Sequence, residues 1–246
     1  MIHARRLLVV AVILLFAFSA ARAGDFANLN FIGFSKDGKY LAFEEYGVQD
    51  GSGFPYSNIY FVDVAKNSFA SPAISVRLEI ETASEQTARS RAKVGAAVTL
   101  KKLRIIERNT GTLVVSRLLT DSGISNHLND DPAKNQTINF AELIGSMYRL
   151  GDYDLVLKPV AVKPKECDYS DQAVYKFELS LKDKMEDKIT ILQKDATLPT
   201  SRACPIDYAM QHVYLYENAI AVFVNTYHIG FEGPDMRYMV VTGKYK

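Results

Sequence analysis

The chain has little of what most metal-dependent, catalytic and nucleic-acid-binding sites require. Its 246 residues include two cysteines, four histidines and no tryptophan, and 29 basic residues against 28 acidic ones give a formal net charge of +1. Zinc and other transition metals need several His, Cys or carboxylate ligands close together, and no histidine here has a partner at ligand spacing. A balanced charge also gives no overall field that attracts nucleic acid. We therefore expect no metal, no cofactor and no nucleic-acid partner.

Motifs of the common enzyme classes are missing as well. The chain contains no Gly-x-Ser-x-Gly elbow, no phosphate-binding P-loop and no dinucleotide fingerprint after a strand. Glu44 and Glu45 offer two adjacent carboxylates, but neighbouring residues of a strand point to opposite faces of the sheet. These two groups are therefore not expected to act on one substrate, and we predict no catalytic residue.

Only one long apolar run occurs, and it lies in the first part of the chain. Arg5 and Arg6 precede the apolar residues 7–18, and Ala21-Arg22-Ala23 then offers a cleavage site of the A-x-A type. This order is typical of a secretory signal peptide, and the run is shorter than the roughly 20 residues that cross a bilayer. We predict cleavage after Ala23, which leaves residues 24–246 as a single β-rich domain without a membrane span, in the periplasm or outside the cell.

The two cysteines, Cys167 and Cys204, both follow the predicted cleavage site. In an oxidising compartment two cysteines most simply form a disulfide. A reactive thiol would need a Cys-x-x-Cys motif or an activating histidine nearby, and the sequence around Cys167 and Cys204 has neither. We therefore predict a Cys167–Cys204 disulfide.

Residues 31–64 carry the clearest local pattern. Phe31-Ile32-Gly33-Phe34 leads through a tight turn, Ser35-Lys36-Asp37-Gly38, into Tyr40-Leu41-Ala42-Phe43, and a strand at residues 58–64 follows a Gly-rich stretch. This segment resembles one repeat of a WD40-like propeller of the Tol-Pal type, in which an aromatic-Ser-x-Asp-Gly-Lys-x-Leu-Ala-Phe hairpin precedes an Ile-Tyr-x-x-Asp strand. The resemblance is limited to this segment and implies a β-meander.

A fainter copy of this unit lies near the C-terminus. Sliding the sequence along itself sets Tyr214 on Phe34, Phe223 on Phe43, and Glu217-Asn218 on the turn of the first hairpin. Asn218 tolerates the positive φ that such turns use. If the two units are a true repeat, we expect them to lie side by side and close the fold. The alternative is that any two β-meanders share this apolar spacing.

One helix is expected between the two units. Thr82-x-x-Glu85 is a capping-box pattern, and Ala88, Ala92, Ala96, Leu100 and Leu103 then fall on one face. The opposite face is basic, which suits an anionic lipid or an acidic partner. The favoured alternative is a solvated face above an alanine-rich packing stripe.

Further strands are expected over residues 112–119, 136–140, 154–162, 173–181 and 188–193, with a short helix within 140–150. The predicted fold class is therefore mainly β with one amphipathic helix (α+β). It has β-meander units at both ends, arranged either as a degenerate, propeller-like fold or as a two-sheet β-fold.

Aromatic and carboxylate side chains gather in the long loops of the two terminal units. Loops on a rigid sheet often bind partners, and Tyr and Phe supply contact area at low entropic cost. The alternative is that Phe54 and Phe231 only pack these loops onto the core. The candidate binding residues are Tyr46, Asp50, Phe54 and Tyr56 in the first unit and Tyr227, His228, Phe231 and Asp235 in the second.

Two functions are compatible with these observations. The first is a non-catalytic binding or interaction module, whose partner is another envelope or secreted protein. The second is an extracytoplasmic hydrolase that acts on envelope or extracellular polymers, for which the sequence provides the compartment but no catalytic residues. The first is favoured.

As a whole, the chain resembles a family of predicted secreted bacterial proteins without an established function. The residues that carry this resemblance are the signal peptide, the stretch at 42–55 (AFEEYGVQDGSGFP) with the following strand at 59–63, and the Ala/Arg-rich helix. The resemblance implies export and a domain that spans the mature chain. It implies no activity, cofactor or site residue.

Overall fold

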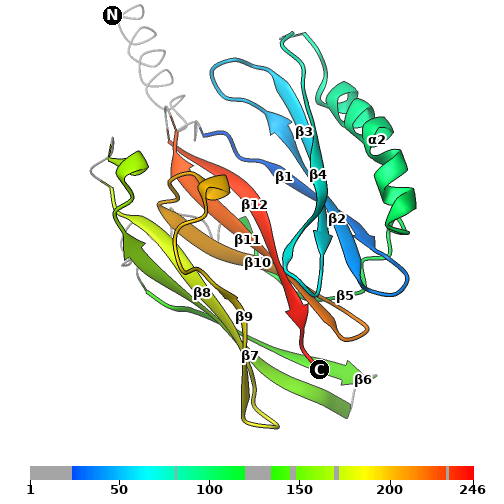
Figure 1. Cartoon of the computed structure of the whole chain (residues 1–246), viewed down its shortest axis with the longest axis vertical. Helices are drawn as coiled ribbons and strands as arrows, with labels where there is room; N and C mark the ends of the chain where they lie inside the picture. Colours follow the sequence, from blue (N-terminus) through cyan, green and yellow to red (C-terminus); the bar gives the residue numbers. More distant parts are fainter. Residues whose placement is uncertain (1–23, 81, 120–133, 145–147, 169–171, 231–232) are drawn as a thin grey trace, which may run out of the picture.

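The computed structural model describes residues 24–80, 82–119, 134–144, 148–168, 172–230 and 233–246, and these form three antiparallel four-stranded sheets (Figure 1). The first sheet has the order β1 (Asn28–Phe34), β2 (Tyr40–Val48), β3 (Pro55–Asp63) and β4 (Ser68–Arg77). The central sheet has the order β12 (Pro234–Lys244), β11 (Ala219–Ile229), β10 (Asp207–Tyr216) and β5 (Thr112–Ser116). The third sheet has the order β6 (Gln136–Ile144), β7 (Tyr148–Val162), β8 (Val174–Asp183) and β9 (Lys188–Lys194). Helix α2 spans Glu85–Lys102, and the short 3-10 helices η1 and η2 span Lys165–Cys167 and Thr200–Arg202.

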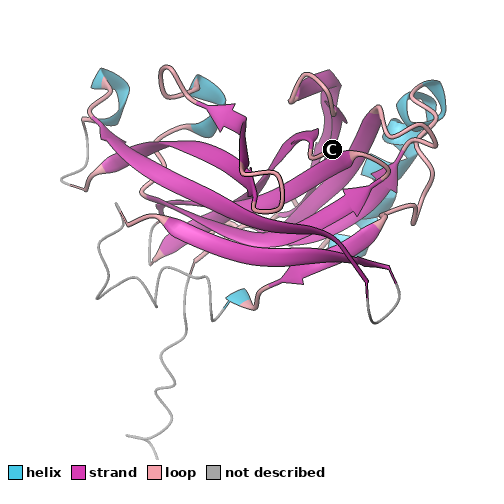
Figure 2. Ribbon diagram, turned by 90° about the horizontal axis from the view of Figure 1, so that it is seen from below, coloured by secondary structure: helices cyan, strands magenta, loops and turns pink. Residues whose placement is uncertain are grey.

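Helix α2 and the three sheets follow one another as layers, and hydrophobic side chains fill each space between them (Figure 1). One cluster joins α2 to the first sheet, a second joins the first sheet to the central sheet, and the largest joins the central sheet to the third. Figure 2 shows the same molecule from below, with strands making up most of it. The predicted fold class, mainly β with one helix, is confirmed.

The central sheet is buried on both faces, and its sequence shows why. In β11, Ala221 and Phe223 pack toward the first sheet, whereas Val222 and Val224 pack toward the third. A strand that is covered on both sides has no reason to alternate polar with apolar residues, and nine consecutive residues of β11 are buried. The chain completes this sheet last, because β5 precedes the third sheet and β10–β12 follow it. In the strand order of this sheet β12 is an edge strand, and its side chains pack against the first sheet on one face and the third sheet on the other.

The meander units predicted at both ends are present, and they pack face to face. The rings of Phe43 and Phe223, which the internal comparison aligned, lie 5.4 Å apart between the first and central sheets. One detail of the comparison is wrong: Glu217, not Asn218, has the positive φ of 53° in the second hairpin. Tyr245 fixes this turn, since its N–H donates to the Asn218 carbonyl and its hydroxyl to the Glu217 carbonyl.

Helix α2 buries Ala88, Ala92, Ala96 and Leu100, as their spacing predicts. The N-cap, however, is Ser84 and not Thr82, because the Ser84 hydroxyl accepts a hydrogen bond from the Thr87 N–H at 3.1 Å. The short helix expected within residues 140–150 is also wrong. Residues 140–144 continue β6 and residues 148–150 begin β7, and buried Ile138 and Phe140 alternate with polar neighbours as a strand requires.

The predicted disulfide between Cys167 and Cys204 is confirmed. It joins η1 to the chain just before β10, and so links the third sheet to the central sheet. A loop of this length gives about 4 kcal/mol of stabilisation on the chain-entropy model. Of the helices in the described ranges, none combines the length and the apolar character needed to cross a bilayer.

Candidate functional site

A groove of about 690 Å³ runs along the edge strand β12, a volume typical of natural ligand pockets. We call it the inter-sheet groove, because all three sheets line it. The first sheet contributes Phe43, Glu45, Asn58, Tyr60, Val62 and Phe69. The central sheet contributes Thr226 and His228 of β11 and, from β12, Asp235, Arg237, Tyr238, Met239 and Val240. Gln193 of the third sheet and residues 199–203, which follow it, form the opposite wall.

An aromatic ladder leads from the core to the rim of the inter-sheet groove. The ring of Phe43 contacts Phe223 in the core and stacks on Tyr60 at 4.9 Å, and Tyr60 stacks on Phe69 at 5.8 Å. Phe69 lies on the edge strand β4 and is 62% exposed. An exposed aromatic ring that is held in place by a buried ladder offers a rigid apolar contact surface.

Charged and hydrogen-bonding side chains form the other end of the groove. Arg237 makes an ion pair with Asp25 at 2.5 Å, and its guanidinium lies 5.3 Å from the ring centre of Tyr56. The Tyr56 hydroxyl donates to the Asp25 carboxylate at 3.3 Å. Glu45 accepts the backbone N–H of Tyr238 at 2.7 Å. Two nearly buried carboxylates, Asp25 and Glu45, therefore share one cation.

Burial changes the acidity of this cluster. It raises the pKa of Asp25 above its ordinary value, and the nearby Arg237 only partly offsets the increase. It also raises the pKa of Glu45, although the hydrogen bond from Tyr238 N–H acts in the opposite direction. At His228 burial lowers the pKa, which favours the neutral imidazole.

The raised pKa of Glu45 predicts a pH-dependent effect of Glu45→Gln. Below the ordinary pKa of 4.5 the carboxyl is protonated in both folded and unfolded chains, so burial of charge costs nothing. As the pH rises through the higher folded-state pKa, the folded wild type must bury a charge and loses stability, whereas the glutamine variant does not. We expect Glu45→Gln to become progressively more stable relative to wild type between pH 4 and pH 8, as measured by urea unfolding.

Asp37→Asn is the control, because Asp37 lies on an exposed turn and its pKa is lowered, chiefly by the Ser35 hydroxyl. Its free-energy difference from wild type should stay nearly constant between pH 4 and pH 8, because Asp37 titrates below its ordinary pKa of 3.8. If the difference in unfolding free energy between Glu45→Gln and wild type stays constant between pH 4 and pH 8, the raised pKa of Glu45 is contradicted.

The opposite wall of the groove is fixed by buried contacts. Arg202 in η2 makes an ion pair with buried Asp195, and its guanidinium lies 4.5 Å from the ring centre of Phe177. The Arg202 carbonyl lies 2.9 Å from Nε2 of His228. Cys204, two residues after Arg202, forms the disulfide with Cys167. The loop at residues 199–203 is therefore held by a disulfide, an ion pair and a hydrogen bond.

The structure brings some of the sequence-predicted residues together and separates others. His228 and Asp235 line the inter-sheet groove, and Tyr56 lies behind its charged end beside Arg237. Tyr227 is fully buried and packs against Phe26.

The remaining candidates lie elsewhere or are not described. Asp50 and Phe54 are in the β2–β3 loop, away from the groove. Tyr46 lies on the side of helix α2, where its ring is 3.7 Å from the Arg89 guanidinium. Phe231 lies outside the described residues.

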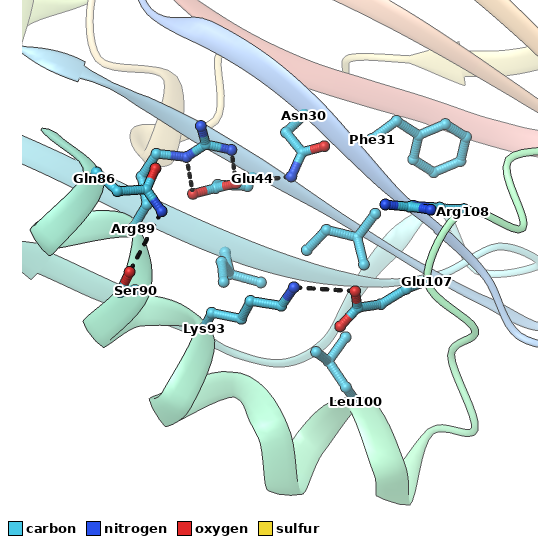
Figure 3. Close-up of a pocket in the computed structure, with 12 residues that line it drawn as sticks. Asn30, Phe31, Glu44, Gln86, Arg89, Ser90, Lys93, Leu100, Glu107 and Arg108 are labelled. Carbon is cyan, nitrogen blue, oxygen red and sulfur yellow. Dashed lines mark hydrogen bonds and ion pairs between the residues drawn. The ribbon is translucent and has the colours of Figure 1, made fainter.

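A second pocket of about 300 Å³ lies between α2 and the first sheet (Figure 3). Here Arg89 donates two hydrogen bonds to Glu44, both at 2.9 Å, and Asn30 donates a third at 2.8 Å. Although burial opposes it, these bonds from Arg89 and Asn30 hold the pKa of Glu44 below its ordinary value. Lys93 pairs with Glu107 across the pocket at 3.0 Å. Most of the charged groups in this pocket are therefore paired with one another, which leaves few of them to bind a ligand.

The side chains of Glu44 and Glu45 lie on opposite sides of the first sheet, as strand geometry predicts. Glu44 contacts helix α2, and Glu45 contacts β12 of the central sheet.

Sequence reasoning missed Glu45, Asn58, Phe69 and Arg237 as groove residues, although one signal was available. Phe69 is the one aromatic residue on a strand that also contains three serines and a proline. Within the described ranges, no three His, Cys, Asp or Glu side chains are arranged to hold a metal ion.

Comparison with known proteins places the chain in a family. No curated protein matches it. A model of a family described as predicted secreted protein, DUF2259, matches residues 42–244, which is more than half of the chain. The matched part includes the helix, the disulfide and the described part of the groove from Phe43 to Val240. The chain belongs to the DUF2259 family of predicted secreted proteins.

Proposed function

We propose that this chain is an exported, non-catalytic binding protein whose inter-sheet groove takes the ligand. The signal peptide directs export to the periplasm or the cell exterior and is removed after Ala23, and the ligand is part of another envelope or secreted protein. The observation that carries the proposal is the groove itself, which combines an exposed aromatic rim at Phe69 with a charged end at Arg237. Pockets that join apolar walls to a few polar groups are the usual form of binding sites.

The arrangement of the charged end favours binding over catalysis. A general acid or base needs a free polar group that can reach the substrate. Glu45 accepts a backbone N–H, Asp25 is held by Arg237 and Tyr56, and His228 lies 2.9 Å from a carbonyl. These contacts hold the wall in shape, and His228 and Asp235 contribute polar surface to it.

The proposal is tested with small aromatic probes and one pair of variants. Phenol, indole and benzamide are measured against the purified chain by saturation-transfer NMR, with wild type, Phe69→Ala and Ile189→Ala. Ile189 is the matched control, because it is 63% exposed on the edge strand β9 but lies outside the groove. Loss of one aromatic contact should weaken binding of the probes about fivefold in Phe69→Ala and leave it unchanged in Ile189→Ala. Equal binding by all three proteins, or binding by none, would reject the groove as the binding site.

A further inference from the structure

We propose that the ligand is an extended peptide segment that pairs as an added strand with the backbone of Val240 on the edge of β12. This inference rests on the proposed function and specifies its ligand. Edge strands present unpaired backbone groups, and strand addition to such an edge is a common mode of peptide recognition.

The direction of the Val240 backbone follows from its neighbours in β12. In an antiparallel pair, alternate residues direct their N–H and C=O away from the partner strand. The N–H groups of Met236, Tyr238 and Thr242 all bond to groups outside the central sheet: the Asp25 carbonyl, the Glu45 carboxylate and the Asn67 side chain. Val240 has the same parity and pairs with Phe223 in an unbroken register. Its N–H and C=O therefore also point away from β11.

Val240 differs from these three neighbours in having an open edge. It lines the inter-sheet groove and is only partly buried. Among the described residues, none accepts a hydrogen bond from its N–H. Glu45 and Asn67 take the N–H groups on either side, so the opening between Tyr238 and Thr242 is about 13 Å long at the usual rise per residue.

The protein already adds one strand segment to this edge. Residues 25–27 run parallel to β12: Met236 N–H donates to the Asp25 carbonyl, and Ala27 N–H donates to the Met236 carbonyl, both at 3.0 Å. The chain then turns away into β1, and the Glu45 carboxylate takes the next outward N–H, at Tyr238. The edge thus accepts an extended segment at one end and is open again at Val240.

The walls indicate which side chains the peptide carries. A strand beside β12 directs alternate side chains to opposite sides. One side meets the rings of Phe43, Tyr60 and Phe69, and the other meets the polar residues Gln193, Ser201 and Thr226. The occupant is therefore an extended segment that alternates large apolar residues with small polar ones.

The test begins with random linear peptides displayed on phage and selected against the purified chain 24–246 with its disulfide intact. A selected peptide is then synthesised, together with analogues in which single backbone amides are N-methylated. N-methylation removes a donor but keeps every side chain. We expect methylation of amides on the paired side to weaken binding about tenfold, and methylation of the alternate amides to change it by less than about twofold.

Two variants of Val240 test the same bond from the protein side. Proline is tolerated on an edge strand where the N–H points outward, so Val240→Pro removes the donor without breaking a bond to β11. Val240→Ala is the control, because it shortens the side chain and keeps the N–H. We expect a loss of about tenfold in peptide affinity for Val240→Pro and less than about threefold for Val240→Ala. Thermal unfolding of both variants shows whether they are folded. If Val240→Pro does not fold, the N-methylated peptides alone test strand addition.

The outcomes separate this inference from the proposed function. Binding that depends on the paired amides and on the Val240 N–H supports both. Peptide binding that neither change affects overturns strand addition. Aromatic probes that bind at Phe69 while no peptide is selected also overturn strand addition, and leave the proposed function in place. A groove that binds neither probes nor peptides overturns both.

Discussion

Arg237→Ala is expected to reduce the free energy of unfolding by about 3 kcal/mol, because it leaves two carboxylates without their shared cation. Asp25 and Glu45 are both buried, and Arg237 pairs directly with Asp25. Removing one partner of a buried ion pair is costly mainly through the charge left behind. Urea unfolding of the purified chain at pH 7 measures the loss.

A double variant tests whether charge is the cause. Adding Asp25→Asn to Arg237→Ala removes one of the two unpaired charges and should recover part of the lost stability. Lys93→Ala is the control, since the Lys93–Glu107 ion pair is largely exposed and should contribute less than about 1 kcal/mol. If Arg237→Ala lowers the free energy of unfolding no more than Lys93→Ala does, the Arg237–Asp25 ion pair does not stabilise the cluster of Asp25, Glu45 and Arg237.

Phe223→Ala is expected to cost about 3–5 kcal/mol, the range for removing a buried phenylalanine. Phe223 is fully buried in the central sheet, and its ring lies 5.1 Å from Phe31 and 5.4 Å from Phe43. The cavity would open at the centre of the contact between the first and central sheets. Urea unfolding measures this loss as well.

Phe69→Ala is the matched comparison, because it removes the same side chain from the exposed end of the same aromatic ladder. We expect it to cost less than about 1 kcal/mol, since most of the Phe69 ring is in solvent in either state. Similar losses of unfolding free energy for Phe69→Ala and Phe223→Ala would contradict this expectation. They would show that Phe69 contributes to stability as much as a core residue does.

Local features of this fold could be predicted where neighbouring residues determine them. The alanine spacing at Ala88, Ala92 and Ala96 identified the helix and its buried face. The Ser35–Gly38 turn follows from its own side chains, since Ser35 Oγ donates to Asp37 Oδ1 and accepts the Tyr40 N–H. The disulfide followed from the count of cysteines and the expected compartment. The cap at Ser84 was missed because Thr82 and Ser84 are both capping residues, and only the start of the helix distinguishes them.

The groove could not be predicted, because it depends on which sheets become neighbours. Glu45, Phe69, Arg202 and Arg237 are far apart in the sequence, and they come from all three sheets or their loops. Periodicity shows that a strand has a buried face, but it does not show which sheet covers that face. The continuous apolar run of β11 is consistent with a strand that is buried on both faces, but a buried helix can produce the same run. The order of the sheets is therefore information that the local patterns do not contain.

The most direct test of the account is a map of backbone amide shifts by NMR when the aromatic probe of highest affinity is added to the isotopically labelled chain 24–246. The map distinguishes binding in the inter-sheet groove from binding in the pocket between α2 and the first sheet. We predict that the largest shifts occur at Asn58, Phe69 and Val240. Shifts concentrated at Arg89, Lys93 and Glu107 would place binding in the other pocket and contradict the account.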